Sequence, residues 1–289
     1  MTKPMTLKQF QAKFPTDDAC LEHLFHTRYG DDVVCPKCGE IGTFHRLAGK
    51  PAFTCNCGHH IHPMAGTPFM DTRTPLTTWF HVMFLFCASR NGVSAKEVQR
   101  QSGVTYKTAW RMCNRVRQYM GYVDGDAPLG GPDASAGPVE VDQAFLGGHD
   151  KMGHDDKAIV LGMVERGGDV MTRIIQGRDW WSTTRAMNEN VMEGSLVYTD
   201  DANVFKTLKH LGYRHDSVNH SIKEYVRGDV HTNSIESFWS NLKRSISGTY
   251  VCVSKKHLQT YLREFEFRYN LRKHPHLMLE ALLLSFPKP

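Results

Sequence analysis

The spacing of apolar residues divides the 289-residue chain into two halves. In the first half apolar side chains recur at intervals of three and four residues, which predicts helices. The segments with this spacing are residues 7–29, in which Asp17 marks a second helix start, 75–90 and 94–120. Residues 33–62 lack the period and hold a cluster of cysteines. We therefore expect short helices around a cysteine-rich segment.

The segment 94–120 carries the signals of two helices joined by a turn. Ser94 is a helix-capping residue type, and Glu97 follows it three positions later, as in a capping box. Gly103 marks the turn, and Thr105 is placed to cap the second, basic helix. A helix, a glycine turn and a basic helix in this order predict a helix-turn-helix.

Past this unit the pattern changes. Residues 121–138 contain five Gly and three Pro, which is typical of an interdomain linker. Strand-like and helix-like runs then alternate, which predicts a mixed α/β layer fold. The predicted strands are 139–146, 158–165, 170–176, 196–199 and 213–218, and the predicted helices are 182–193, 202–211, 233–247 and 255–272. The chain is thus predicted to be multidomain, with a helical lead-in and cysteine-rich unit (1–70), a helix-turn-helix region (71–120), a linker (121–138) and an α/β domain (139–289).

The formal net charge is only +5, but the basic residues are unevenly distributed. Residues 92–120 hold six basic residues and one acidic residue, and residues 223–273 hold ten and five. Such segments favour contact with a polyanion, although two solvated helical faces would give the same pattern. The side chains placed for nucleic-acid contact are Arg100, Lys107, Arg111 and Arg115.

Four of the eight cysteines fall in the knuckles CPKCG and CNCG, as Cys35, Cys38, Cys55 and Cys57. Two cysteine pairs about 15–20 residues apart predict a structural zinc ribbon, in which four ligands close the metal site. The second knuckle is one residue short, so His59, His60 or His62 could replace one cysteine.

No signal peptide or membrane-length apolar run is evident, since the longest apolar runs are about half a membrane span. We therefore expect a cytoplasmic protein without a membrane partner. In that reducing compartment clustered cysteines bind metal more often than they form disulfides.

Two aspartates belong to strand-like runs in the second half. Asp142 lies within VEVDQAF, and Asp200 ends the run LVYTD. Carboxylates directed from strands into one cleft suit Mg²⁺, which prefers oxygen ligands. Either aspartate alone would more often be a turn or cap residue, so the pair carries the prediction.

The segment HTNSIESFWSNLKR, residues 231–244, forms an amphipathic helix when plotted at 100° per residue. Asn233, Glu236, Ser240 and Lys243 share one face, and Ile235, Trp239, Leu242 and Ile246 share the other. A carboxylate and a cation on one exposed face suit a metal and a phosphodiester together, although a solvated face would look the same. His231 could orient a phosphate or a water molecule.

Taken together, these segments resemble the DDE transposases of the IS1595 family, which carry an ISXO2-like transposase domain. The resemblance spans residues 15–273 and rests on CPKCG with CNCG, GTPF, LTTWF, VEVDQAFLGG, VYTDD, VNHSIKEYVRGDVHTNSIESFWSNLKR, GTY and KKHLQTYLREFEFRYNLR.

The resemblance implies an RNase H-like catalytic domain that binds two Mg²⁺ or Mn²⁺ ions. It makes Asp142, Asp200 and Glu236 the three acids and Lys243 the basic residue after the third acid. Some relatives use Asn as the third ligand, so Asn233 is the alternative to Glu236. We favour Glu236, because a charged oxygen binds Mg²⁺ better than an amide does.

The implied function is binding of transposon ends in double-stranded DNA, strand cleavage, and joining to target DNA by a homo-oligomer. Two other hypotheses are a non-catalytic DNA-binding regulator, built from the zinc ribbon and helix-turn-helix, and an RNase H-like nuclease that lacks strand transfer.

Overall fold

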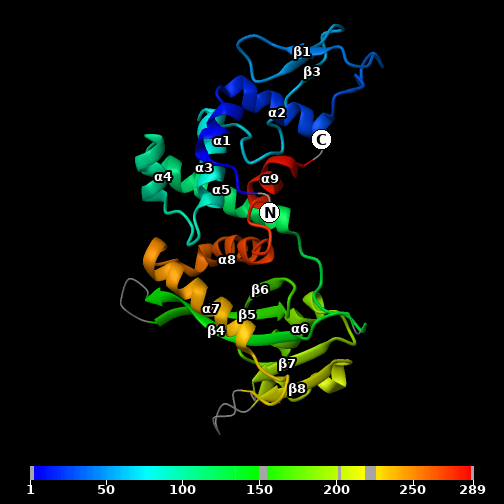
Figure 1. The fold of residues 1–289 in the computed structure, drawn as a ribbon, viewed down its shortest axis with the longest axis vertical. Coiled ribbons are helices and arrows are strands. Elements are labelled where there is room, and N and C mark those ends of the chain that lie inside the picture. Colours follow the sequence, from blue (N-terminus) through cyan, green and yellow to red (C-terminus); the bar gives the residue numbers. More distant parts are fainter. Residues whose placement is uncertain (1–2, 134, 150–154, 201–202, 219–225, 288–289) are drawn as a thin grey trace. The chain divides into compact units, whose positions relative to one another are not determined.

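The computed structural model in Figure 1 divides the chain into two compact units, which are Met1–Tyr119 with His274–Pro289 and Met120–Lys273. The residues that it describes are 3–133, 135–149, 155–200, 203–218 and 226–287. Parts of the sequence blocks VYTDD and VNHSIKEY therefore lie outside the described residues. No helix among the described residues is long and apolar enough to cross a membrane.

The first unit combines short helices with a small antiparallel sheet. Its helices are α1(Leu7–Lys13), α2(Asp17–Tyr29), α3(Leu76–Ala88), α4(Ala95–Ser102), the greater part of α5(Tyr106–Asp124), and α9(Leu277–Leu284). The sheet has the order β1(Phe44–Arg46), β2(Phe53–Cys55) and β3(His60–Ile61). The predicted stretch 7–29 is two helices, since Thr16 accepts a hydrogen bond from the Ala19 amide and starts α2 anew.

The turn between α4 and α5 follows the predicted signals. The Ser94 hydroxyl accepts a hydrogen bond from the Glu97 amide at 3.2 Å and caps α4. The Glu97 carboxylate accepts instead from Arg100 and Gln101, so only this half of the predicted capping box forms. Gly103 ends α4 in the left-handed region, with φ of 68°, where glycine is favoured. Thr105 then caps α5 by accepting from the Thr108 amide at 3.3 Å. The local signals therefore place both helices and the turn correctly.

The C-terminal segment packs in the first unit, whereas the predicted α/β domain ran to residue 289. The Tyr119 hydroxyl donates to the Leu282 carbonyl at 2.8 Å, and Tyr119 also stacks on Phe286. Arg28 donates to the Pro287 carbonyl at 2.7 Å. Because α9 is largely apolar, it needs a partner surface, and this unit supplies one.

The second unit is built on a five-stranded mixed sheet with the order β6-β5-β4-β7-β8. The strands are β4(Val139–His149), β5(Asp155–Glu165), β6(Val170–Ile175), β7(Leu196–Asp200) and β8(Arg214–Val218). β4, β5 and β6 pair antiparallel, while β7 lies parallel to both β4 and β8. This is the predicted mixed α/β architecture.

Helices cover both faces of this sheet (Figure 1). One face packs against α6(Trp180–Asn190) and the short 3₁₀ turns η1(Asn203–Phe205) and η2(Leu208–Leu211). The other packs against α7(Asn233–Ser245) and α8(Lys255–Asn270), with the π-helical turn η4(Ile246–Tyr250) between them. The helix predicted over 202–211 is thus a pair of 3₁₀ turns in its described part.

The glycine-rich segment 121–138 is not a free linker where it is described. Leu129 forms a β-bridge with Val191, and the Gly131 amide donates to the Ser195 hydroxyl at 2.9 Å. A Cβ on Gly130 would stand 2.5 Å from Ser195 Oγ, so this close approach requires glycine. The segment therefore packs against the second unit through the Leu129 bridge and the close approach of its glycines.

Candidate functional site

The four predicted cysteines come together in the first unit. Cys35 and Cys38 lie in the first knuckle, Cys55 ends β2, and Cys57 follows it, with all four sulfurs within 4.8 Å of one another. Two of the sulfur–sulfur distances, Cys35–Cys57 and Cys38–Cys55, are 3.6 Å. A tetrahedral zinc with Zn–S bonds of about 2.3 Å places its sulfurs about 3.8 Å apart. The arrangement therefore supports a structural zinc ion.

The shortened second knuckle still provides its second cysteine. Cys57 belongs to the group of ligand atoms, whereas His59, His60 and His62 do not. Among the described residues, these four sulfurs are the one set of His, Cys, Asp and Glu ligand atoms gathered so tightly. The alternative with a histidine as the fourth ligand is therefore not supported.

Zinc content provides a direct check. We expect purified protein to hold about one zinc per chain, and Cys57→Ser to lose most of it, while the matched variant His59→Ala keeps it. Because binding of a structural zinc contributes about 10–16 kcal/mol to folding in small zinc modules, the Cys57→Ser ribbon should unfold before the second unit does. Elemental analysis and tryptic digestion measure both effects. Full zinc content in Cys57→Ser would contradict the assignment.

The two predicted aspartates are neighbours on adjacent parallel strands. Val141 on β4 pairs with Thr199 on β7, so the next residue on each strand, Asp142 and Asp200, lies at the same level of the sheet. Because side chains alternate between faces along a strand, both point to the face covered by α7. The sheet register therefore brings the two carboxylates toward each other.

Asp142 is mostly buried and has a specific partner. Its Oδ2 accepts a hydrogen bond from Trp239 Nε1 at 3.1 Å. Opposite it on β5 stands Gly162, where a Cβ would lie 2.3 Å from the Trp239 ring, so glycine makes room for the indole. Burial, with added repulsion from the negative charges of Asp200 and Glu236, raises the pKa of Asp142 to about 6. The three acids are thus close enough to interact electrostatically.

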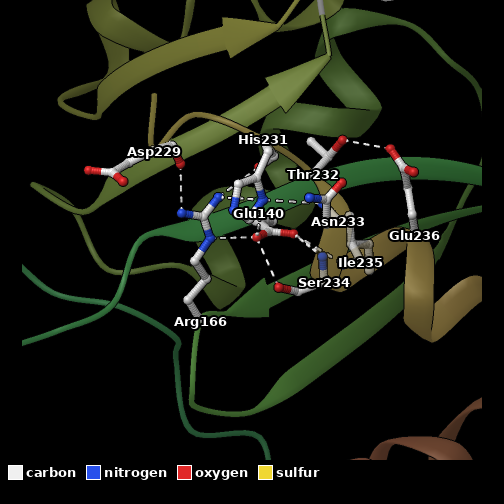
Figure 2. A network of polar contacts seen from close by, with 9 residues as sticks. All are labelled: Glu140, Arg166, Asp229, His231, Thr232, Asn233, Ser234, Ile235 and Glu236. Carbon is white, nitrogen blue, oxygen red and sulfur yellow. Dashed lines mark hydrogen bonds and ion pairs between the residues drawn. The ribbon is translucent and has the colours of Figure 1, made fainter. Parts of the chain in front are cut away.

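Helix α7 presents the two faces that its sequence predicts. Asn233, Glu236, Ser240 and Lys243 are exposed, while Ile235, Trp239 and Leu242 are buried against the sheet and Ile246 is partly buried. Glu236 Oε1 accepts a hydrogen bond from the Thr232 hydroxyl at 2.8 Å at the start of the helix (Figure 2). Glu236 and Lys243 therefore lie on the exposed side of a helix whose other side is fixed to the sheet.

Two residues of this region were not predicted. Glu140, two residues before Asp142, is fully buried, and Arg166, just after β5, contacts it with Nε to Oε1 at 2.6 Å (Figure 2). The predicted residue His231 is part of the same network, since its Nδ1 accepts from Arg166 Nη2 at 2.8 Å. The alternation in Val-Glu-Val-Asp places Glu140 on the same sheet face as Asp142, and this pattern is the sequence feature from which Glu140 could have been identified.

The four predicted DNA-contacting residues differ in their surroundings. Lys107 and Arg111 are exposed and lie one turn apart on α5. Arg100 is exposed but paired with Glu97 on α4. Arg115 is turned inward, where its Nη1 donates to the carbonyls of Pro68 and Met70 at 3.0 and 3.1 Å. Arg115 therefore stabilises the first unit, and Lys107 and Arg111 are the better placed for a ligand.

Comparison with known families matches both halves of the chain. Residues 15–60 match the transposase zinc-ribbon domain, and residues 135–270 match the ISXO2-like transposase domain. Both domains are named for the IS1595 group.

Two relatives extend this match. An uncharacterized protein in transposable element ISH50 of Halobacterium salinarum is 27% identical over 281 residues, covering 87% of this chain and 90% of the relative. An uncharacterized transposase-like protein of Haemophilus influenzae is 31% identical over 84 residues, covering 29% of this chain and 67% of the relative. The first similarity thus includes both units.

Proposed function

Since the chain belongs to the IS1595 family of transposases, we propose that it is a DDE transposase that cleaves DNA at insertion-sequence ends and joins them to target DNA. The observation that carries the proposal is the placement of three acids. Asp142 and Asp200 lie on neighbouring parallel strands, and Glu236 lies on the helix above them, near enough to affect the pKa of Asp142. The proposed catalytic domain begins at residue 139.

The topology of the second unit supports an RNase H-like fold for this domain. Three antiparallel strands are followed by two that extend the sheet on the other side in parallel orientation. The first acid lies on the first of these strands, the second acid on the fourth, and the third acid on a later helix. Acids from three separate elements thus lie on one face of the sheet.

The donor set fits a hard divalent cation. It consists of carboxylates, and the partly buried Asp142 has like charges rather than a cation as its main electrostatic neighbours. Asp142, Asp200 and Glu236 would hold Mg²⁺ or Mn²⁺, which prefer oxygen ligands. When bound, such ions activate the attacking oxygen and stabilise the leaving one in an in-line phosphoryl transfer.

The protein's own residues position the DNA and shape the cleft. Lys243 is exposed seven residues after Glu236 on the same helix face, where its ammonium would pair with a phosphate next to the cut. Trp239 holds Asp142 through its indole N–H, which fixes the rotamer of that carboxylate. Glu236 is favoured over Asn233 as the third ligand, because a charged carboxylate oxygen binds Mg²⁺ better than an amide oxygen does.

A strand-transfer assay tests the proposal against its two rivals. The full chain, as the homo-oligomer that we expect on DNA, is mixed with Mg²⁺ and DNA carrying the element's ends, and with a target plasmid. A transposase yields 3′-OH ends and joined products. A nuclease yields cuts without joining, and a regulator yields binding alone, so either of these results overturns the proposed function.

Recognition of the transposon end is proposed to use α5 as the second helix of a helix-turn-helix. We expect the full-chain variant Lys107→Ala/Arg111→Ala to bind end DNA about 10–100-fold more weakly and to lower the slope of log affinity against log salt by about 2, because each lost phosphate contact releases one counterion fewer. Lys3→Ala/Lys8→Ala, which removes two exposed charges from the same unit, is the matched control. Equal losses in both variants would indicate a general charge effect instead of a contact surface.

A further inference from the structure

Glu140 is a buried carboxylate that the proposed cleavage reaction does not use. Its side chain is 0% exposed, and it lies on β4 two residues before Asp142, on the same face of the sheet. Its Oε2 accepts hydrogen bonds from the backbone amides of Ser234 at 2.7 Å and Ile235 at 3.1 Å, and its Oε1 accepts from the Ser234 hydroxyl at 3.0 Å (Figure 2). A carboxylate from the central strand thus caps the first turn of α7.

Arg166 completes this network from the other side. Its Nε donates to Glu140 Oε1 at 2.6 Å, and its Nη1 donates to the Asp229 carbonyl at 2.7 Å. Its Nη2 donates to the His231 carbonyl at 2.9 Å and to His231 Nδ1 at 2.8 Å, while the guanidinium lies over the Tyr198 ring. One guanidinium therefore links β4 and β7 to the segment that leads into α7, and Figure 2 shows its contacts with Glu140, Asp229 and His231.

The physical chemistry of this arrangement favours a fixed position for α7. The first amides of a helix have no partner within the helix, and an anion at this end is stabilised by the helix dipole. Glu140 supplies both the acceptor and the charge. A buried carboxylate is tolerated when it is paired and fully hydrogen-bonded, and here a guanidinium, a hydroxyl and two amides meet it.

Both ends of this network adjoin proposed metal ligands. Asp142 follows Glu140 by two residues on β4, and Glu236 follows Ile235 directly on α7. We infer that Glu140 and Arg166 are positioning residues, which hold the first turn of α7 against β4 and thereby set the spacing between Asp142 and Glu236. The inference rests on the proposed catalytic role of these acids. Neither Glu140 nor Arg166 is assigned a contact with DNA or metal.

The chain offers a matched control for a buried ion pair. Glu264 on α8 is also 0% exposed, and it accepts from Arg268 at 2.9 Å and from the Tyr250 hydroxyl at 2.9 Å. Glu264→Gln therefore removes a comparable buried charge from the same unit, at a site whose described partners lie on α8 and η4. Glu140→Gln keeps an oxygen for the α7 amides but loses the charge that pairs with Arg166.

Amide hydrogen exchange in metal-free protein is the first readout. We expect the amides of residues 231–240 to exchange at least about tenfold faster in Glu140→Gln than in the unsubstituted protein, since opening of the first turn no longer breaks an ion pair. Glu264→Gln should leave these amides unchanged and accelerate exchange in α8 instead. Unchanged exchange over 231–240 in Glu140→Gln overturns the inference.

Metal binding and cleavage are the second and third readouts. We expect Glu140→Gln to need about 10–100-fold more Mn²⁺ for half-saturation in a calorimetric titration without DNA, as is typical when a residue that orients metal ligands is lost. Cleavage at saturating metal should fall at least about tenfold, with end affinity within about twofold of the unsubstituted protein. Glu264→Gln should stay within about threefold in all three measurements.

Two further variants separate positioning from folding. Arg166→Lys keeps the positive charge but lacks the planar fork of the guanidinium. We expect smaller changes of the same direction in amide exchange, Mn²⁺ affinity and cleavage, so this variant tests the inference if Glu140→Gln does not fold. Glu140→Gln/Arg166→Met should recover part of the lost melting temperature, because no buried charge is left unpaired, without recovering Mn²⁺ affinity. If Mn²⁺ affinity recovers together with melting temperature, the pair is only structural. If Asp142→Asn cleaves DNA normally in the same assay, the proposed function is wrong. The hydrogen-exchange result still shows whether Glu140 holds the first turn of α7, so the two failures can be distinguished.

Discussion

Replacing Asp142, Asp200 or Glu236 by the corresponding amide is expected to lower cleavage at transposon ends by at least about 1,000-fold in Mg²⁺, with end binding within about threefold of the unsubstituted protein. The change is small in volume, so the fold should be kept. In the proposed mechanism, each substitution removes one negative charge from the set that would balance two divalent cations where charge develops in the transition state. A plasmid cleavage assay with a parallel binding measurement gives both numbers.

Helix α7 supplies the controls for this prediction. Ser240 shares the exposed face of Glu236 but is not among the proposed metal ligands, so Ser240→Ala should cleave at a near-normal rate. Asn233→Ala tests the alternative third ligand, since Asn233 lies one turn before Glu236 on that face. Mn²⁺ should partly rescue the acid variants, being less strict about its ligands than Mg²⁺.

The possible outcomes separate the hypotheses. Normal cleavage by Glu236→Gln with an inactive Asn233→Ala would make Asn233 the third ligand. Normal cleavage by all three acid variants would place the metal site elsewhere and contradict the DDE mechanism proposed for this chain.

The face pattern of α7 shows what the sequence predicts well. A helical period is local information, so exposure of Glu236 and Lys243 and burial of Ile235 and Leu242 follow from their spacing alone. The capping signals at Ser94 and Thr105 are equally local, and the structure places both caps as predicted. The sheet strands were found for the same reason, and each end lies within three residues of its predicted position.

Long-range packing was not predictable in this way. Glu140 lies in a run with period two, which equally suits a solvent-facing strand, and its partners at Arg166 and Ser234 are 26 and 94 residues away. Nothing local to any of these residues indicates the ion pair. The packing of α9 in the first unit is a similar case. An apolar run predicts that a helix is buried but does not identify the surface that covers it.

The zinc ligands were only partly predictable from local sequence. The first knuckle has a recognised spacing, and Cys38 could be assigned from it. The Cys-x-Cys spacing of the second knuckle left three histidines as alternatives, and only the course of β2 and the turn after it shows that Cys57 reaches the other sulfurs.

The second large effect concerns stability without metal. We expect Asp142→Asn to stabilise the metal-free second unit by about 3 kcal/mol at pH 8, which corresponds to a rise in melting temperature on the order of 5–10 °C. The cause is burial, which raises the pKa of Asp142 from 3.8 to about 6 together with the charges of Asp200 and Glu236. Asparagine has no charge to bury and can still accept the hydrogen bond of the Trp239 indole N–H.

The direction with pH follows from the raised pKa. Folded protein binds this proton more tightly than unfolded protein, so the neutral carboxyl favours the folded state and stability falls as pH rises from 3.8 through 6. The advantage of Asp142→Asn should therefore be full above about pH 7 and about half as large at pH 5. Asp124, whose pKa burial raises to about 7, titrates in both proteins and cancels in the comparison.

Metal should reverse this order of stability. We expect added Mg²⁺ or Mn²⁺ to stabilise the folded state of the unsubstituted protein by mass action, and Asp142→Asn to lose most of that gain. Asp216→Asn is the control, since Asp216 is about half exposed and paired with Arg227, and its removal should shift stability by less than about 0.5 kcal/mol. Calorimetry at pH 5 and pH 8, with and without metal, measures all four states. If Asp142→Asn melts at a lower temperature than the unsubstituted protein at pH 8 without metal, the negative charge of Asp142 does not destabilise the metal-free protein. Its assignment to the proposed metal site is then wrong.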